Sequence, residues 1–307
     1  MKNVSSKPLK KKKGLAHLKY AGWDAYLWLA PSLILIAIFI LAPVVETMYL
    51  SFCDVSKAGI VRKAGTLDNY KFVVSQTVFG RVMLNTILWD IIIVSVSMVL
   101  SIILALVLNE KFHGRKIVRT VLLLPWATSE LITACAWKYI FDYNYGALNT
   151  LLMKAGLIST PINWLGEVNS AFACMIFVGI IVTIPFMTFT LLSGLTSISP
   201  DYYEAAKIDG ANFWQRLTNV TLPLLKPAID VSIVLNVIYV FNSFVIIHQM
   251  TDGAPAQQTS TIMTYLFYLA FRTNKMGPAA AISMIGFVVL LIFAVLYMKY
   301  QMKEETS

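Results

Sequence analysis

The segment Ser199–Pro227 reads SPDYYEAAKIDGANFWQRLTNVTLPLLKP, and apolar runs flank this polar stretch on both sides. Each flanking run is long enough to cross a bilayer, which takes about 20 predominantly apolar residues. A turn between two membrane spans needs only a few residues. A connector that is much longer than a turn indicates a structured surface, so we expect this segment to be a docking site for another protein.

The local sequence of this connector predicts two short amphipathic helices. Ser199 can cap the first helix, with Pro200 in its first turn. Gly210 permits the sharp bend that ends it, and Asn212 can cap the second helix. Leu222-Pro223 then leads into the next apolar run. The alternative interpretation is a helix pair that lies at the membrane interface and only anchors the connector.

The composition is that of an integral membrane protein. Hydrophobic residues make up 58% of the chain and charged residues only 13%, whereas soluble domains carry about a quarter charged residues. Three cysteines are scattered without metal-ligand spacing, and we interpret them as small packing residues: Cys53, Cys135 and Cys174. The apolar composition indicates an all-α fold with six membrane spans that uses nearly the whole chain.

Six membrane spans are expected, each with enough apolar residues to cross. They cover residues 25–50, 85–108, 117–141, 171–195, 227–247 and 279–297. The first run is too long for the core of a signal peptide, so we expect it to be retained. The predicted organisation is a basic N-terminal segment 1–24, a membrane domain 25–298 that contains the 199–227 connector, and a tail 299–307.

The distribution of Lys and Arg predicts the orientation. With the N-terminus inside, 16 of the 25 basic residues fall in inner segments, as expected for cytoplasmic loops. Both termini and the connector are then cytoplasmic. The run Lys10–Lys13 suits anionic lipid at that face, so the net charge of +9 indicates a lipid partner and not a nucleic acid.

Motifs for chemistry are absent from the sequence. It contains no G-x-x-x-x-G-K-[ST], no H-E-x-x-H and no G-x-S-x-G, so no enzymatic activity is expected. Of the histidines, His17 and His113 fall in basic cytoplasmic segments where we expect them to be solvated. His248 falls at the outer end of the fifth span, where a pore-mouth role and an interfacial role remain equally open.

Three groups of residues in the connector resemble the EAA loop of ABC-importer permeases. The groups are Glu204-Ala205-Ala206, Asp209-Gly210 with Ala211, and Leu222-Pro223. In that family the loop forms a coupling helix that sits in a cleft of the cytoplasmic ATPase. The resemblance implies that these residues couple the chain to an ATPase. Several fixed residues at fixed spacing make the match specific.

Further stretches resemble the sugar permeases of the maltose and glycerol-phosphate importer type. These stretches are Leu67–Tyr70, Asn85-Thr86, Arg119, Leu124–Trp126, Trp137, Tyr145–Asn149, Thr251–Pro255, Thr259 and Gly277–Ile282. One departure is Asp252-Gly253-Ala254-Pro255, where the family usually has Gly-Gly-Pro. The resemblance implies the type I ABC importer permease fold.

The resemblance also implies a function and a set of partners. The chain is expected to be the permease subunit of an ATP-driven importer that moves a sugar or oligosaccharide from an extracytoplasmic binding protein into the cytoplasm. A second, similar permease and two ATP-binding subunits complete the assembly, and the binding protein docks around Gly146 to Gly166. ATP and Mg²⁺ belong to the ATPase, so no cofactor is expected in this chain. The particular cargo stays open.

Polar residues within apolar spans predict the transport path, because such residues are costly in a membrane unless they face a cavity or a partner. In the fifth span the spacing places several of them on roughly one helical face: Asn236, Tyr239, Asn242 and Ser243. In the fourth span Pro185 is expected to bend the helix near Thr183. The resemblance places sugar contacts at matching positions: Gly179, Thr183, Phe186, Asn236, Val240 and Ser243. The alternative is that these residues bind the neighbouring permease.

Two acidic residues lie in or near spans, Asp90 in the second and Glu130 in the third. Either could mark a proton or ion path, but packing against a polar neighbour or a partner subunit is favoured because no second acidic residue or histidine recurs nearby. An ion-coupled secondary transporter would show two similar halves, and the sequence shows no such duplication. A membrane scaffold without transport is the third class considered, but it would not need polar groups within the fifth span.

Overall fold

The computed structural model describes residues 23–57 and 59–305. The chain divides into two compact units, Met1–Tyr49 and Leu50–Ser307. Most of the predicted N-terminal segment 1–24, including His17 and the Lys10–Lys13 run, lies outside the described residues. The first unit contains α1 (Trp23–Ile36), the π-helix η2 (Ala37–Leu41) and most of α2 (Ala42–Ser51). Together they form the first predicted span, since Trp28–Ser51 is long and apolar enough to cross a membrane.

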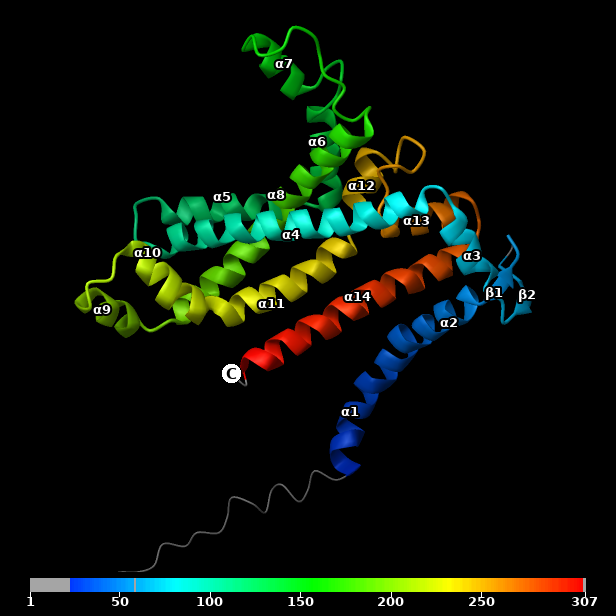
Figure 1. The fold of residues 1–307 in the computed structure, drawn as a ribbon, viewed down its shortest axis with the longest axis horizontal. Coiled ribbons are helices and arrows are strands. Elements are labelled where there is room, and N and C mark those ends of the chain that lie inside the picture. Colours follow the sequence, from blue (N-terminus) through cyan, green and yellow to red (C-terminus); the bar gives the residue numbers. More distant parts are fainter. Residues whose placement is uncertain (1–22, 58, 306–307) are drawn as a thin grey trace, which may run out of the picture. The chain divides into compact units, whose positions relative to one another are not determined.

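Three long helices form the core of the second unit: α4 (Phe79–Asn109), α8 (Val168–Ser197) and α11 (Leu222–Phe241). They pack on one another in pairs (Figure 1), because each presents a stripe of apolar and small side chains to the other two. Fully buried members of this core come from all three helices: Trp89, Ile93, Met175, Leu191 and Leu225. The second and fourth predicted spans are confirmed, and α8 continues without interruption past Pro185.

A second apolar cluster lies where α14 (Met276–Glu305) meets shorter elements. The strands β1 (Cys53–Val55) and β2 (Val61–Ala64) form an antiparallel hairpin, and α3 (Asp68–Ser75) packs against α14. The helix α13 (Ile262–Phe267) and the π-helix η4 (Tyr268–Arg272) also pack on α14. The sixth predicted span is confirmed within α14, which continues as a helix through most of the predicted tail 299–307.

The expectation of one continuous third span is wrong. Residues 117–141 fall in two helices, α5 (Arg115–Ala127) and α6 (Glu130–Ile140), which meet at an angle of 93°. Pro125 cannot donate a hydrogen bond within the helix, and Thr128 then adopts an extended backbone with its hydroxyl donating to the Pro125 carbonyl at 3.0 Å. The described residues contain five helices long and apolar enough to cross a membrane, or six if this bent pair counts as one span.

The fifth span also differs from its expected range of 227–247. It begins at α10 (Phe213–Arg216), passes through the π-helix η3 (Leu217–Thr221) and runs into α11. It then breaks after Phe241 and resumes as α12 (Val245–Met250). Pro223 is tolerated because it lies in the first turn of α11. The second connector helix is therefore the beginning of the fifth span.

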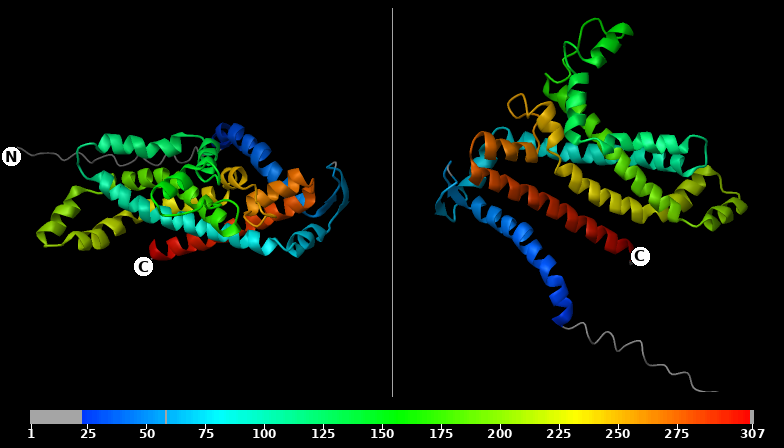
Figure 2. Two further views of the ribbon diagram at one scale, coloured as in Figure 1. Left: turned by 90° about the horizontal axis from the view of Figure 1, so that it is seen from above. Right: turned by 180° about the vertical axis from the view of Figure 1, so that it is seen from behind.

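The connector and the 251–272 segment occupy opposite ends of the second unit. Figure 1 and Figure 2 show α9 (Pro200–Ile208) and α10 at one end, with α12, α13 and η4 at the other. A further short helix, α7 (Ala147–Lys154), lies in the loop between α6 and α8. Polar interactions hold the 251–272 segment to α4: the Asn85 side chain donates to the Ser260 carbonyl at 3.0 Å, and the Ile262 amide donates to the Thr86 hydroxyl at 2.9 Å.

Candidate coupling and transport site

The connector has the local structure that its sequence predicts. The Asp201 amide donates to the Ser199 hydroxyl at 3.3 Å, which caps α9. Gly210 has a φ of 77°, in the left-handed region that glycine adopts without steric cost. Asn212 and Gln215 form a reciprocal capping box at the start of α10. The two-helix prediction and both caps are confirmed.

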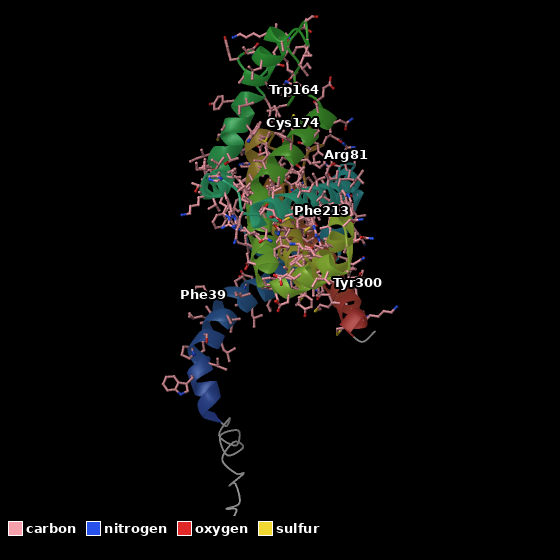
Figure 3. All side chains as sticks on the ribbon, turned by 90° about the vertical axis from the view of Figure 1, so that its left-hand side faces the viewer. Phe39, Arg81, Trp164, Cys174, Phe213 and Tyr300 are labelled. Atoms are coloured by element: carbon pink, nitrogen blue, oxygen red, sulfur yellow. The ribbon has the colours of Figure 1, made fainter. Side chains whose placement is uncertain are left out.

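The surface of the connector is rich in uncovered apolar side chains. Ile208 is 86% exposed and Trp214 is 70% exposed, and Phe213, labelled in Figure 3, also faces solvent. Exposed residues of the EAA-like groups lie on the same segment: Glu204, Ala205, Asp209, Gly210 and Pro223. Ala206 and Leu222 are partly buried. Contiguous exposed apolar patches mark interaction sites, so this segment has the character of a docking surface.

A small cavity lies between α4, α6, α8 and α11 in the second unit. Five of the eight predicted path residues line it: Gly179, Thr183, Tyr239, Val240 and Ser243. Its volume of ≈ 10 Å³ is room for about one water molecule. A sugar ring does not fit into this space, so a transport path needs either a different conformation or surfaces from another subunit.

The other three predicted path residues do not line the cavity. Asn236 is only 2% exposed, and its amide donates to the Ser232 carbonyl of its own helix at 2.8 Å. Asn242 lies past the end of α11, where its side chain donates to the Ile238 carbonyl at 2.7 Å. Phe186 faces the outside of the bundle near Phe189 and Val231. The expectation that the polar residues of the fifth span share one helical face is wrong, because the helix ends at Phe241.

Glu130 and Trp89 line the cavity although the sequence did not place them there. The bend of the third span brings Glu130 to the start of α6, where the Ser243 hydroxyl donates to its carboxylate at 3.3 Å. The Trp89 indole donates to the Val240 carbonyl at 3.1 Å and so ties α4 to the last turn of α11. Glu130 thus has a polar neighbour of the kind that the favoured interpretation expects, and its role stays a prediction.

Asp90 behaves differently from Glu130. Its Oδ1 atom is buried without a hydrogen-bond partner in the part of the chain that the structure describes. The expected polar neighbour is therefore not found among those residues.

The cysteines agree with their interpretation as packing residues, since Cys53 and Cys174 are buried and all three are free thiols.

His248 belongs to a polar cluster at the end of α12. Its Nδ1 atom lies 2.6 Å from the Asp252 carboxylate, and an Arg272 guanidinium nitrogen donates to the same carboxylate at 3.1 Å. The His248 ring stacks on Phe244 with centroids 4.6 Å apart. Asp252 begins the Asp-Gly-Ala-Pro group, so this cluster joins the start of the 251–272 segment to its end. Among the described contacts, His248 thus has an anchoring role.

The loop between α6 and α8 is organised around the buried side chain of Asn149. Its amide donates to the Ile162 carbonyl at 2.9 Å, and its oxygen accepts from the Ile162 amide at 3.1 Å and the Trp164 indole at 2.9 Å. A Cβ atom at Gly146 would lie 2.2 Å from the Asp142 carbonyl oxygen, so only glycine fits there. These contacts give Gly146 and Asn149 of the Tyr145–Asn149 group a structural role.

Asn149→Ala is expected to loosen this loop while leaving the spans intact. Loss of the side chain leaves buried polar groups without hydrogen-bond partners, which costs about 1–3 kcal/mol. Amide hydrogen exchange in residues 142–167 should then be roughly tenfold faster or more. Asn144→Ala is the matched control, because Asn144 is exposed and only its backbone amide bonds to Asp142. Unchanged exchange in Asn149→Ala would contradict this role.

The described residues form several helices long and apolar enough to cross a membrane, with an exposed two-helix connector between two of them. These features are those of a multi-span membrane protein, and the comparisons with known proteins identify it as a transport permease. The chain belongs to the family of binding-protein-dependent transport system inner membrane components, whose family model matches residues 97–302. The predicted family and its localisation in a membrane are thereby confirmed.

Similar proteins agree over nearly the whole chain. A Brucella suis protein described as a probable ABC transporter permease is 42% identical over 92% of this chain and 98% of its own length. The trehalose/maltose transport system permease protein of Thermococcus litoralis is 37% identical over 89% of this chain and 92% of its own length.

Solved structures agree as well. A subunit of a bacterial alginate ABC transporter, crystallised in complex with an alginate pentasaccharide-bound periplasmic protein, superposes with a TM-score of 0.79 at 25% identity. The match covers 93% of this chain and 96% of that one. The predicted all-α, type I importer permease fold is confirmed.

Proposed function

We propose that this chain is the permease subunit of an ATP-driven ABC importer that moves a sugar or oligosaccharide from a binding protein into the cytoplasm. The observation that carries the proposal is the exposed two-helix connector, with the EAA-like groups on its surface, between two spans of a family member. The cargo class is supported by relatives named for trehalose/maltose and sulfoquinovosyl glycerol transport. The same connector argues against an ion-coupled secondary transporter, which needs no ATPase dock.

A second permease subunit is part of the proposal. The cavity of this chain holds about one water molecule, whereas Tyr239 next to it is 49% exposed and offers an aromatic surface. A facing subunit would turn this half-open surface into an enclosed path. Sugar rings stack on aromatic side chains through their apolar faces and hydrogen-bond at their rims, and Thr183, Ser243 and Glu130 supply oxygen atoms nearby.

The remaining partners follow from the connector. Two ATP-binding subunits, which carry the ATP and Mg²⁺, would receive α9 of each permease in a cleft, and this chain would do no chemistry. The Lys and Arg distribution supports both termini and the connector on the cytoplasmic side. The binding protein would then dock at the opposite face, where the Asn149-centred loop offers Tyr145, which is 91% exposed.

Motion of the docked connector can reach the path directly. When ATP draws the two ATP-binding subunits together, α9 and α10 move with them, and α8 and α11 are attached at either end. These two helices carry Gly179, Thr183, Tyr239 and Val240 of the cavity lining. A change in their angle therefore opens or closes the space between them.

The test is co-purification from mild detergent, with mass spectrometry of the associated proteins and uptake in proteoliposomes. An ATP-binding subunit and a second permease should accompany the chain, and uptake should need ATP and a loaded binding protein. A chain that purifies alone from membranes containing those partners, or uptake driven by an ion gradient without ATP, would refute the proposal.

Tyr239→Ala is expected to slow uptake. The loss of an aromatic stacking surface, worth about 0.5–1.5 kcal/mol, corresponds to a decrease of roughly two- to tenfold. ATPase activity without substrate should be unchanged, because Tyr239 lies far along α11 from the connector. Phe287→Ala is the control, since Phe287 is also 49% exposed but does not line the cavity. Equal uptake by the two variants would show that Tyr239 is not part of the transport path.

A further inference from the structure

A larger cavity lies at the base of the connector, within the second unit. It has a volume of ≈ 340 Å³, at the lower end of the range of pockets that hold small ligands, about 300–1,000 Å³. Its walls come from the last residues of α4 and α8 and from the inner faces of α9, α10 and η3. The central cavity is formed by other residues, so the two spaces are distinct.

Three charged side chains line this cavity: Glu110, Lys207 and Arg216. None of them forms an ion pair or a side-chain hydrogen bond with another residue in the described part of the chain. The hydroxyl of Tyr203 is on the same face of α9 as Lys207, one turn earlier. Two cations and one carboxylate at one cavity form a set of charges that a ligand with one negative and one positive group can satisfy.

From the length of α4 we expect the cavity to lie at the depth of lipid head groups. The helix α4 has 31 residues, which at 1.5 Å per residue gives about 46 Å. A bilayer is about 40–45 Å thick including its head groups, so Glu110, directly after the end of α4, is at the polar interface. The same depth applies to Leu195 near the end of α8.

Part of the cavity wall is apolar. It contains Leu106, Val107, Leu195 and Leu217, and Val107 is 51% exposed on the surface of α4. The cavity therefore combines aliphatic side chains, mostly from the ends of α4 and α8, with two cations from the connector and the Glu110 carboxylate at the end of α4. A soluble polar ligand would gain little binding energy from the aliphatic side chains. A phospholipid can place its polar head against the charged side chains and its acyl chains against the aliphatic ones.

We infer that this cavity binds the head group of a phospholipid that carries both a phosphate and a primary ammonium, as phosphatidylethanolamine does. Lys207 and Arg216 would hold the phosphate, since charge-assisted hydrogen bonds are the strong ones, and Glu110 would accept from the ammonium. The lipid would fill the space between the connector and the ends of α4 and α8. The inference goes beyond the proposed function, and lipid binding can be measured without transport.

The experiment measures which lipids stay with the purified protein, together with whatever subunits co-purify, after incorporation into nanodiscs of equal phosphatidylethanolamine, phosphatidylcholine and phosphatidylglycerol. Native mass spectrometry should show phosphatidylethanolamine enriched over phosphatidylcholine. Lys207→Gln with Arg216→Gln should lower retained phosphatidylethanolamine about tenfold or more, given about 1.5–3 kcal/mol for each charged hydrogen bond. Lys111→Gln with Lys116→Gln, which removes equal charge from exposed residues outside the cavity, should leave it unchanged.

The Glu110→Gln variant tests recognition of the ammonium group separately from recognition of the phosphate. It should weaken the preference for phosphatidylethanolamine over phosphatidylcholine, because the charge-assisted hydrogen bond from the primary ammonium is lost. A trimethylated ammonium donates no such bond to either variant, and phosphate binding should persist. Equal loss in the cavity and control variants, or a preference for phosphatidylglycerol that ignores Glu110, would overturn the inference. So would displacement of the retained lipid by inorganic phosphate, since the site would then take phosphate alone.

Discussion

Glu204→Lys is expected to abolish uptake while the protein still inserts in the membrane. Glu204 is exposed on α9 and forms no ion pair or side-chain hydrogen bond with the described residues, so the fold does not depend on it. We expect its carboxylate to pair with a basic group of the ATPase. Breaking a desolvated ion pair across an interface costs about 2–5 kcal/mol, and reversal of the charge adds repulsion. ATPase binding should thus weaken roughly thirty-fold or more.

The measurement compares uptake in proteoliposomes with the amount of ATPase that co-purifies. Asp54→Lys is the control, because Asp54 is exposed in β1 and belongs to neither the connector nor the central cavity. Glu204→Gln should have an intermediate effect, since it keeps the size and loses the charge. Normal uptake by Glu204→Lys would exclude a coupling role for this residue, whatever partners remain bound.

Gly194→Ala is expected to destabilise the protein even though alanine favours helices over glycine. Here α8 crosses α11 so closely that an added Cβ would lie 2.6 Å from the Ala228 Cβ atom and 2.9 Å from a Leu225 methyl group. Forcing extra volume into a packed core costs about 1–3 kcal/mol. The crossing lies just before the connector, so the two helices that frame the connector would be pushed apart.

Gly80→Ala is a matched control for this effect. Gly80 also lies in a helix, but a Cβ atom there meets nothing within 4 Å. It should stabilise the protein by up to about 1 kcal/mol, the difference in helix propensity. Thermal unfolding in detergent, with co-purified ATPase as a second readout, should move in opposite directions for the two variants. A shift in the same direction for both would disprove the close crossing.

Local signals in the sequence predicted local structure well. Ser199, Gly210 and Asn212 each determine the backbone within a few residues, and all three act as predicted. Long apolar runs likewise predicted α4, α8 and α14. Pro125 and Thr128-Ser129 are signals for the bend, but the apolar run through them favours one continuous span. The Thr128 hydroxyl that donates to the Pro125 carbonyl stabilises the bend, and no apolar pattern indicates that contact.

The central cavity was only partly predictable, because contacts between distant segments form it. The Trp89 hydrogen bond joins residues 151 positions apart, and the Glu130–Ser243 bond joins residues 113 apart. Neither has a signal in local spacing. Asn236 and Asn242 satisfy their amides on their own helix, which polarity alone could not reveal. The functional roles of the path and connector residues stay predictions for the experiments above.

The two ends of the connector differ mechanically. Ile198 and Ser199 both have extended backbones, so the helical hydrogen-bond pattern is interrupted between α8 and α9, and we expect this joint to be the more flexible end. At the other end, Leu217, Thr221 and Leu222 all keep helical dihedral angles, so α10, η3 and α11 form one continuous helical segment. If an ATPase moves the connector, we expect α11 to follow that motion more closely than α8 does. This continuous segment ends at Phe241, beside the Trp89 hydrogen bond and the central cavity, so we expect any motion of the segment to reach the cavity at the break before α12.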